Sequence, residues 1–174
     1  MSALTLLKAI LSIPIGVGLA YPFLNSEASG GILVELNIFG PAGSISAIAI
    51  FLLLVFFYAL DLIRCLKFVS PASRKAKPNS VWFMFLLPYN FIEDFFIVTS
   101  VARSLKAEAT SNPALASFKS FGMISGVGWC AAQVVSLIPN LVGSVAGLVA
   151  IGFWVWHWRF IRHANRVLMK SGVS

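Results

Sequence analysis

Two adjacent carboxylates, Glu93 and Asp94, are the side chains in this sequence whose position most suggests chemistry. They lie within an apolar stretch, LLPYNFIEDFFIVTS at residues 86–100. An ionisable group in an apolar layer is costly, and it commonly serves a proton path, a substrate or a partner charge. The alternative is that both carboxylates lie at the membrane interface and pair with Arg103, Arg64 or lipid headgroups. We favour this alternative, because the topology derived below places the pair close to the membrane surface.

The other polar residues in apolar surroundings are expected to have structural roles. Asp61 and Arg64 are three residues apart, so they share a helix face and can form a salt bridge. A link from Asp61 to Arg103 is the alternative. His157 and His163 are six residues apart and do not share a face of one helix. We therefore expect an interfacial histidine among tryptophans rather than a haem or metal ligand.

No strong catalytic motif is present in the sequence. It contains no Ser-His-Asp, HExxH, Walker or GxGxxG arrangement. The two cysteines, Cys65 and Cys130, lack the spacing of a metal site and do not suggest a disulfide framework. We therefore predict a protein that is not an enzyme, with no catalytic residue, no cofactor and no metal.

The composition is that of an integral membrane protein. Of the 174 residues, 59% are hydrophobic and 11% are charged, and the mean hydropathy is +0.89. Long uncharged runs of this kind need lipid as their main solvent. The net charge of +7 arises from short basic runs beside apolar segments, a pattern of membrane topology rather than of nucleic-acid binding.

The apolar runs predict four transmembrane helices in one domain that covers residues 1–174. A run of 39 residues without acidic or basic side chains follows Lys119. One helix of that length would measure about 58 Å, roughly twice the thickness of the hydrocarbon core. Pro139-Asn140 lies near its centre and predicts the turn of a helical hairpin. The predicted spans are residues 3–24, 44–66, 120–138 and 141–158.

The segment at 81–105 is expected to enter and leave the membrane on the same side, or to lie at its interface. If it crossed fully, seven of the thirteen basic residues would lie outside, against the positive-inside rule. If it returns, all thirteen are cytoplasmic. Pro88 supports the return because it ends a helix after seven apolar residues. Tyr89 and Asn90 are then expected to satisfy the backbone groups exposed at the break.

Both termini are therefore predicted to be cytoplasmic, in a bacterial inner membrane. The first helix resembles a signal peptide, and we expect a retained signal anchor. Residues 25–43 are predicted to form an outer loop, with an interfacial helix or strand at 31–39.

Small residues predict how the helices pack. Ala132 and Ser136 in one arm of the hairpin lie as far from the turn as Gly147 and Gly143 in the other, so the two arms are expected to approach closely. The other small pair in the first arm lies too far from the turn and is expected to face another helix; it consists of Gly122 and Gly126.

The stretch KPNSVWFMFLLPYNFIEDFFIVTSVARSL, residues 77–105, resembles small bacterial four-helix membrane proteins of unknown function. The shared features are a tryptophan-containing entry, a proline followed by an aromatic residue, and a basic amphipathic exit. The resemblance implies fold and location and carries no chemistry. The acidic pair departs from that pattern.

Three functions remain open on the sequence. The favoured one is an accessory or scaffold subunit that packs against a larger membrane complex, or a homo-oligomer, with membrane lipids around it. The second is a small transporter or channel component that uses the broken segment at 86–100. The third is a membrane-embedded enzyme acting on lipid or quinone, with the acidic pair as acid and base.

Overall fold

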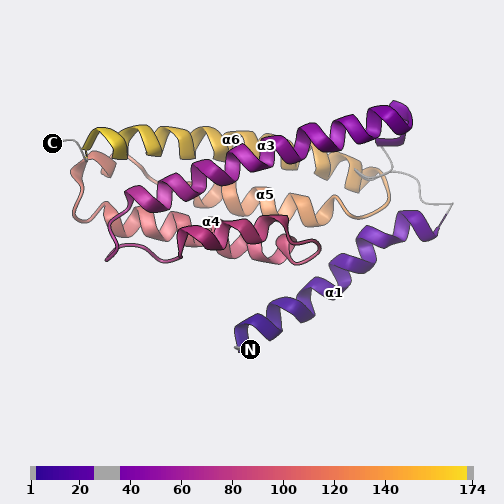
Figure 1. Ribbon diagram of the computed structural model, residues 1–174, viewed down its shortest axis with the longest axis horizontal. Helices are drawn as coiled ribbons and strands as arrows, with labels where there is room; N and C mark the ends of the chain where they lie inside the picture. Colours follow the sequence, from indigo (N-terminus) through magenta and orange to yellow (C-terminus); the bar gives the residue numbers. More distant parts are fainter. Residues whose placement is uncertain (1–2, 26–35, 172–174) are drawn as a thin grey trace.

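The computed structural model describes residues 3–25 and 36–171, and helices make up its architecture (Figure 1). No β-strand occurs in these two ranges. The predicted all-α class is therefore confirmed. The α-helices are α1 (Ala3–Leu24), α3 (Gly40–Phe68), α4 (Asn90–Glu108), α5 (Met123–Val135) and α6 (Leu141–Ser171), and the short 3-10 helices are η1 (Leu36–Phe39), η2 (Pro78–Phe85) and η3 (Pro113–Leu115).

Three of the described helices, α1, α3 and α6, are long and apolar enough to cross a membrane by length and composition. The predicted span at 120–138 is a helix only over the 13 residues of α5. Such a helix measures about 20 Å, which is less than the hydrocarbon core. In contrast, α6 continues for 13 residues beyond the predicted end of its span at 158.

The start of α5 is set by an unusual backbone turn that the sequence pattern does not reveal. Phe121 and Gly122 both have positive φ angles, of 51° and 79°. A Cβ atom on Gly122 would lie 2.6 Å from the ring of Phe160 in α6, so the close approach of α6 also requires glycine there.

The turn between α5 and α6 follows the predicted position. The Asn140 side chain accepts hydrogen bonds from the backbone N–H groups of Val142 and Gly143, at 2.9 and 3.2 Å. These bonds cap the first turn of α6, where backbone donors have no partner inside the helix. The two helices then run antiparallel and pack along their length (Figure 1).

The predicted break near Pro88 is present. η2 ends at Phe85, and α4 begins at Asn90. Both arms pack against each other and against α3. The first arm is a 3-10 helix, and the second is the α-helix expected from the sequence. The segment therefore folds back on itself, as expected for a chain that returns to the side from which it came.

The basic segments of the chain gather at one end of the bundle. Figure 1 shows that the last turns of α3, α4 and α6 lie at the same end, together with the loop at 69–77. This end carries the arginines and lysines of these segments, which the positive-inside argument assigned to the cytoplasm. Lys8, which the argument assigned to the same side, lies instead on α1 beside Glu93 in the first turn of α4. We call it the basic end.

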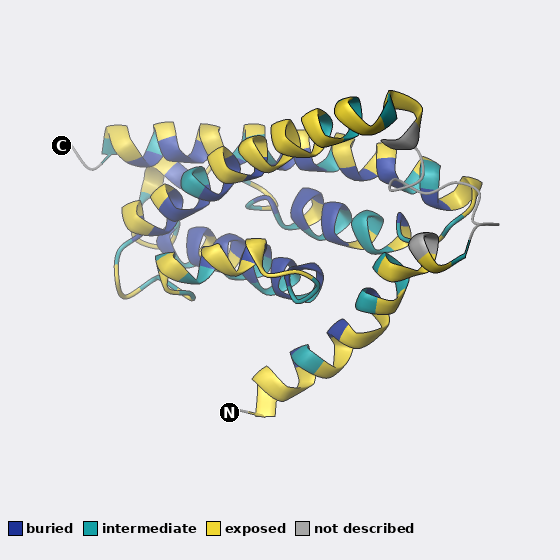
Figure 2. Cartoon of the chain, turned by 45° about the vertical axis from the view of Figure 1, so that its right-hand side comes forward, coloured by how far each residue is buried: buried dark blue, intermediate teal, exposed yellow. Residues whose placement is uncertain are grey.

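The core is built where the helices meet near the basic end. In α3 every buried side chain lies at or beyond Val55, and Tyr58 and Leu62 are fully buried. Leu105 of α4 and Ile161 of α6 pack into the same cluster. α1 lies at an angle to the other helices and is exposed over most of its surface (Figure 2).

The predicted outer loop is described only in part. Residues 26–35 lie outside the described ranges. Of the interfacial segment at 31–39, the part from Leu36 to Phe39 is η1, and α3 starts directly after it.

The predicted orientation can be tested by thiol labelling in intact cells. Ser111, in the exposed loop after α4, should as Ser111→Cys react with a membrane-impermeant maleimide only after permeabilisation. Leu141→Cys, at the turn between α5 and α6, should react without it. The wild-type chain gives the background, because Cys65 and Cys130 are buried. Labelling of Ser111→Cys from outside would contradict the folded-back segment.

Candidate functional site

Glu93 pairs with a residue that the sequence analysis did not consider. Lys8 of α1 donates a hydrogen bond from its Nζ to Oε2 of Glu93 in α4, and both residues are buried. The same ammonium lies 3.9 Å from the centroid of the Phe96 ring, a cation–π contact. The expectation that Glu93 pairs with Arg103, Arg64 or headgroups at an interface is therefore wrong. The sequence did offer one indication of this ion pair, since Lys8 is the one basic residue in the predicted first helix.

Asp94 is buried more deeply than its neighbour. It is 2% exposed, and its Oδ1 has no hydrogen-bond partner in the described parts of the chain. Its burial means that the Asp94 side chain is enclosed within the helices rather than exposed on the outer face of α4. The expected pairing of Asp94 with Arg103, Arg64 or lipid headgroups is wrong, because the side chain is enclosed within the protein and forms no ion pair in the described chain.

A hydrogen bond between Tyr58 and His157 crosses the same region. The Tyr58 hydroxyl lies 2.7 Å from Nδ1 of His157, and neither residue is exposed. Nε2 of His157 has no hydrogen-bond partner among the described residues. It faces Gly126 of α5, where a Cβ atom would lie 3.0 Å from this nitrogen. His157 is thus a core residue and not the interfacial histidine predicted, whereas His163 is exposed.

The central polar group consists of Tyr58, Asp94, Cys130 and His157. It combines an acid, an imidazole, a phenol and a thiol on four helices. These are the residue types of proton transfer, yet all four side chains are buried. No group of three or more metal-binding side chains occurs in the described ranges. What the arrangement offers chemically is a place to hold a proton inside the bundle.

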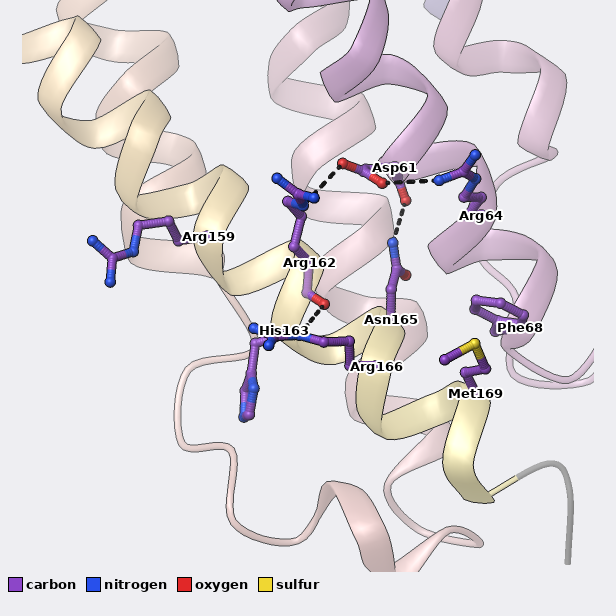
Figure 3. A pocket seen from close by; sticks show the side chains of 9 residues that line it. All are labelled: Asp61, Arg64, Phe68, Arg159, Arg162, His163, Asn165, Arg166 and Met169. Carbon is purple, nitrogen blue, oxygen red and sulfur yellow. Dashed lines mark hydrogen bonds and ion pairs between the residues drawn. The ribbon is translucent and has the colours of Figure 1, made fainter.

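The predicted salt bridge between Asp61 and Arg64 is confirmed, with 3.6 Å between Oδ1 and the guanidinium. Asp61 also lies 3.8 Å from Nε of Arg162 in α6. Its Oδ2 accepts a hydrogen bond of 2.8 Å from the indole N–H of Trp158. Its backbone carbonyl accepts another, also of 2.8 Å, from the Asn165 side chain. Asp61 therefore links α3 to α6 near the basic end of the molecule (Figure 3).

Arg103, the alternative partner of Asp61, does not reach it. The Arg103 side chain is exposed on α4 and forms no ion pair within the described chain. The three residues of α6 that contact Asp61 lie about one hundred residues away in the sequence, and no spacing between residues predicts these contacts.

The residues at the break have different surroundings from those predicted. The Tyr89 ring packs edge-to-face against Phe83. Asn90 is buried, and its Oδ1 has no partner in the described structure. The backbone at the break is satisfied by backbone instead, since the Asn90 N–H donates to the carbonyl of Leu86. The expectation that Tyr89 and Asn90 satisfy the backbone groups at the break is therefore wrong for the Asn90 side-chain oxygen, which accepts no hydrogen bond from a described residue.

The small residues of the hairpin pack as predicted around the turn. A Cβ atom on Gly143 would lie 1.8 Å from the carbonyl oxygen of Ile138 and 3.2 Å from that of Ser136. Gly147 is buried in α6, and Ala132 packs against the core from α5.

The second small pair packs inside this chain. Gly122 lies against Phe160 of α6, and Gly126 lies against Val98 of α4 and His157 of α6. The expectation that this pair faces a helix outside the hairpin is wrong for Gly122, which packs against α6, the other arm of the hairpin, whereas Gly126 contacts α4 as well as α6. The pair is therefore not a free surface for another protein.

A further anchor lies at the basic end, where Glu108 at the end of α4 holds the loop that follows α3. Its Oε2 accepts hydrogen bonds from the Ser70 hydroxyl at 2.6 Å and from the Ser70 backbone N–H at 3.0 Å. Burial favours a higher pKa for Glu108, but the hydrogen bonds from Ser70 and Ser73 outweigh it and lower the pKa below the ordinary value.

The ion pair between Lys8 and Glu93 is expected to hold α1 against α4. Lys8→Met leaves a buried carboxylate without its cation and should lower the free energy of unfolding by about 3 kcal/mol. The double variant Lys8→Met with Glu93→Gln should recover most of that loss. Unfolding in mixed micelles measures both, with Lys106→Met on the exposed side of α4 as control. Equal losses for the single and the double variant would contradict the pair.

The Glu108 contact predicts a loss of stability in acid. A carboxyl whose pKa is lowered on folding stabilises the protein above its ordinary value near 4.5, and this stabilisation disappears as the pH falls through the lowered pKa. The protection of the Ser70 amide, measured as its exchange rate relative to the intrinsic rate at each pH, should therefore be high near neutral pH and be lost in acid, as the pH falls through the lowered pKa of Glu108. In Glu108→Gln this protection should be low at every pH and show no such additional loss in acid.

A comparison with protein-family models, curated proteins and solved structures finds no match for this chain.

Proposed function

We propose that this chain is a non-catalytic integral membrane protein that serves as an accessory or scaffold subunit of a larger membrane complex. The observation that carries the proposal is the outer half of α3. No residue from Gly40 to Leu54 is buried, although this stretch measures about 22 Å. A long helical surface is thus little covered by the described residues of this chain, although the Phe51 ring contacts Trp154 of α6.

The composition of that surface favours protein over lipid as its neighbour. Lipid-facing helix surfaces need only large apolar side chains, whereas small residues let another helix approach closely. Exposed small side chains occur at Ala42, Ser46 and Ala49, one turn or less apart. Ser46 donates its hydroxyl to the carbonyl of Ala42, so the helix satisfies its own polar group and leaves a flat face.

The internal polar groups support a structural role, because most of them bind one another. Lys8 binds Glu93, Asp61 binds residues of α6, and Tyr58 binds His157. One argument for the subunit is lost: Gly122 and Gly126 are occupied within the chain. The proposal therefore depends on α3 and on the similarly exposed α1.

The location proposed with this function is a bacterial inner membrane with both termini in the cytoplasm. Its support is the gathering of the basic segments at one end of the molecule (Figure 1). In this topology α5 and its flanking residues carry the chain from the basic end to the opposite end, and α6 brings it back. The bundle then has four crossings, three of them by long helices.

A small transporter is the second candidate, favoured by Asp94. A carboxyl that is 2% exposed with one oxygen unpartnered, beside a break in a membrane helix, is typical of a proton or ion path. An enzyme is supported least, because Cys130 and His157 are buried and a thiol needs access to react.

The subunit proposal is tested by purification from the source membrane in a mild detergent, followed by mass spectrometry of what co-elutes at fixed ratio. A larger partner is expected. Ser46→Leu should reduce its recovery at least tenfold, because a branched side chain keeps the partner helix from the small-residue face. Ile45→Leu, beside it on α3 and 69% exposed, should not.

Recovery of the chain alone, or only with copies of itself, would contradict the larger partner. Proton flux through proteoliposomes, compared between wild type and Asp94→Asn, would then decide the case for transport.

A further inference from the structure

A pocket of about 850 Å³ opens between the C-terminal parts of α3 and α6, at the basic end (Figure 3). Four of the side chains that line it are arginines, and Asp61 is the only acidic one. Phe68 and Met169 form an apolar edge. The arginines are Arg64 from α3 and Arg159, Arg162 and Arg166 from α6.

The lengths of the two helices place this pocket at the level of lipid phosphates. In α6 the uncharged stretch at 141–158 measures about 27 Å, which matches the hydrocarbon core. In α3 the uncharged stretch at 40–60 measures about 32 Å and ends at Asp61. Three tryptophans, at 154, 156 and 158, mark the same boundary, where indole rings prefer to lie. The arginines of α6 follow over the next two turns.

The arginines are available to a ligand. Arg64 and Arg162 point toward Asp61 from opposite sides, but their distances to it are 3.6 and 3.8 Å, and their side chains are 65% and 66% exposed (Figure 3). Asp61 already accepts the Trp158 indole N–H at 2.8 Å. The Asp61 carboxylate therefore orients the two guanidinium groups without occupying all their N–H donors. Each guanidinium group retains N–H groups whose spacing matches two oxygens of a phosphate.

A second, smaller pocket of about 280 Å³ adjoins the first. It shares Asp61, Arg64 and Arg162 with the larger one and is otherwise lined by Phe57, Leu60 and Trp158. Phe57 and Leu60 precede the first charge of α3, so this pocket lies toward the hydrocarbon core. A charged pocket that continues into an apolar one has the shape of a headgroup followed by the start of an acyl chain.

We propose that the two pockets bind one anionic phospholipid, with its phosphate between Arg64 and Arg162 and the first part of an acyl chain against Phe57 and Leu60. Basic pockets between membrane helices at the cytoplasmic level bind such lipids. A soluble phosphate would use the arginines but not the apolar pocket. The inference does not depend on the subunit proposal, since a lipid can bind the chain whether or not a partner is present.

The experiment is native mass spectrometry of the purified full-length chain, titrated with phosphatidylglycerol, with phosphatidylcholine and with inorganic phosphate. Wild type is expected to retain phosphatidylglycerol and not the other two. Each arginine contributes about fivefold in affinity near an anionic lipid, so Arg64→Gln with Arg162→Gln should weaken binding about thirtyfold.

A second double variant, Arg159→Gln with Arg166→Gln, removes two arginines of the pocket and leaves the contacts of Asp61 with Arg64, Arg162 and Trp158 in place. It should weaken binding by a similar factor, so a loss cannot be ascribed to misfolding at Asp61. Arg103→Gln with Lys106→Gln removes the same charge from the exposed face of α4 and should change binding less than threefold. Phe57→Ser should weaken phosphatidylglycerol binding by removing the acyl contact.

Three results would overturn the assignment. Equal losses in the pocket variants and the α4 control would mean that net charge, not a site, retains the lipid. Inorganic phosphate that competes with phosphatidylglycerol at equal concentration would make this a soluble anion site. Retention of phosphatidylcholine equal to that of phosphatidylglycerol would mean that the arginines do not select an anionic lipid.

Discussion

The structure depends on the rule that a polar side chain in an apolar layer must find a partner inside the protein. With 11% charged residues and long apolar helices, the chain has few polar groups to place, and hydrophobic burial gives little preference for one helix contact over another in lipid. The partners therefore decide which helices meet. Lys8 and Glu93 bring α1 to α4, Asp61 brings α3 to α6, and Tyr58 with His157 repeats the second contact one turn deeper.

Close packing between helices determines the positions that the polar contacts leave open. α5 lies between α4 and α6, and glycine allows it: Gly126 leaves room for both Val98 and His157. A larger residue there would push α6 away and separate the Tyr58 hydroxyl from the His157 ring. The polar and the small residues are thus parts of one arrangement. The outer half of α3 has no buried side chain, and its exposure carries the functional proposal.

The sequence predicted local features such as helix breaks and turns, but it did not predict which side chains pair between helices. Proline removes a backbone donor and crowds the preceding helical turn, so the break at Pro88 and the turn at Pro139-Asn140 were predicted at the right places, although Pro14 is accommodated within α1. The start of α5 depends on a positive φ at Phe121, which no residue preference indicates. Glu93 was placed at the surface because its cation, 85 residues earlier, lies on a helix whose neighbour the sequence does not name. The spacing of His157 and His163 showed that they face apart, but not that His157 faces inward.

Asp61 shows how one residue can serve both the fold and the surface. At the boundary of the apolar layer, a lone carboxylate would be costly, and four arginines around one pocket would repel one another. Placed together, the carboxylate secures the Trp158 indole and reduces the repulsion. One acid cannot neutralise four cations, so the pocket keeps a positive charge. Because both nearby guanidinium groups remain about two-thirds exposed, the contact that closes the inner end of the bundle leaves that charge accessible.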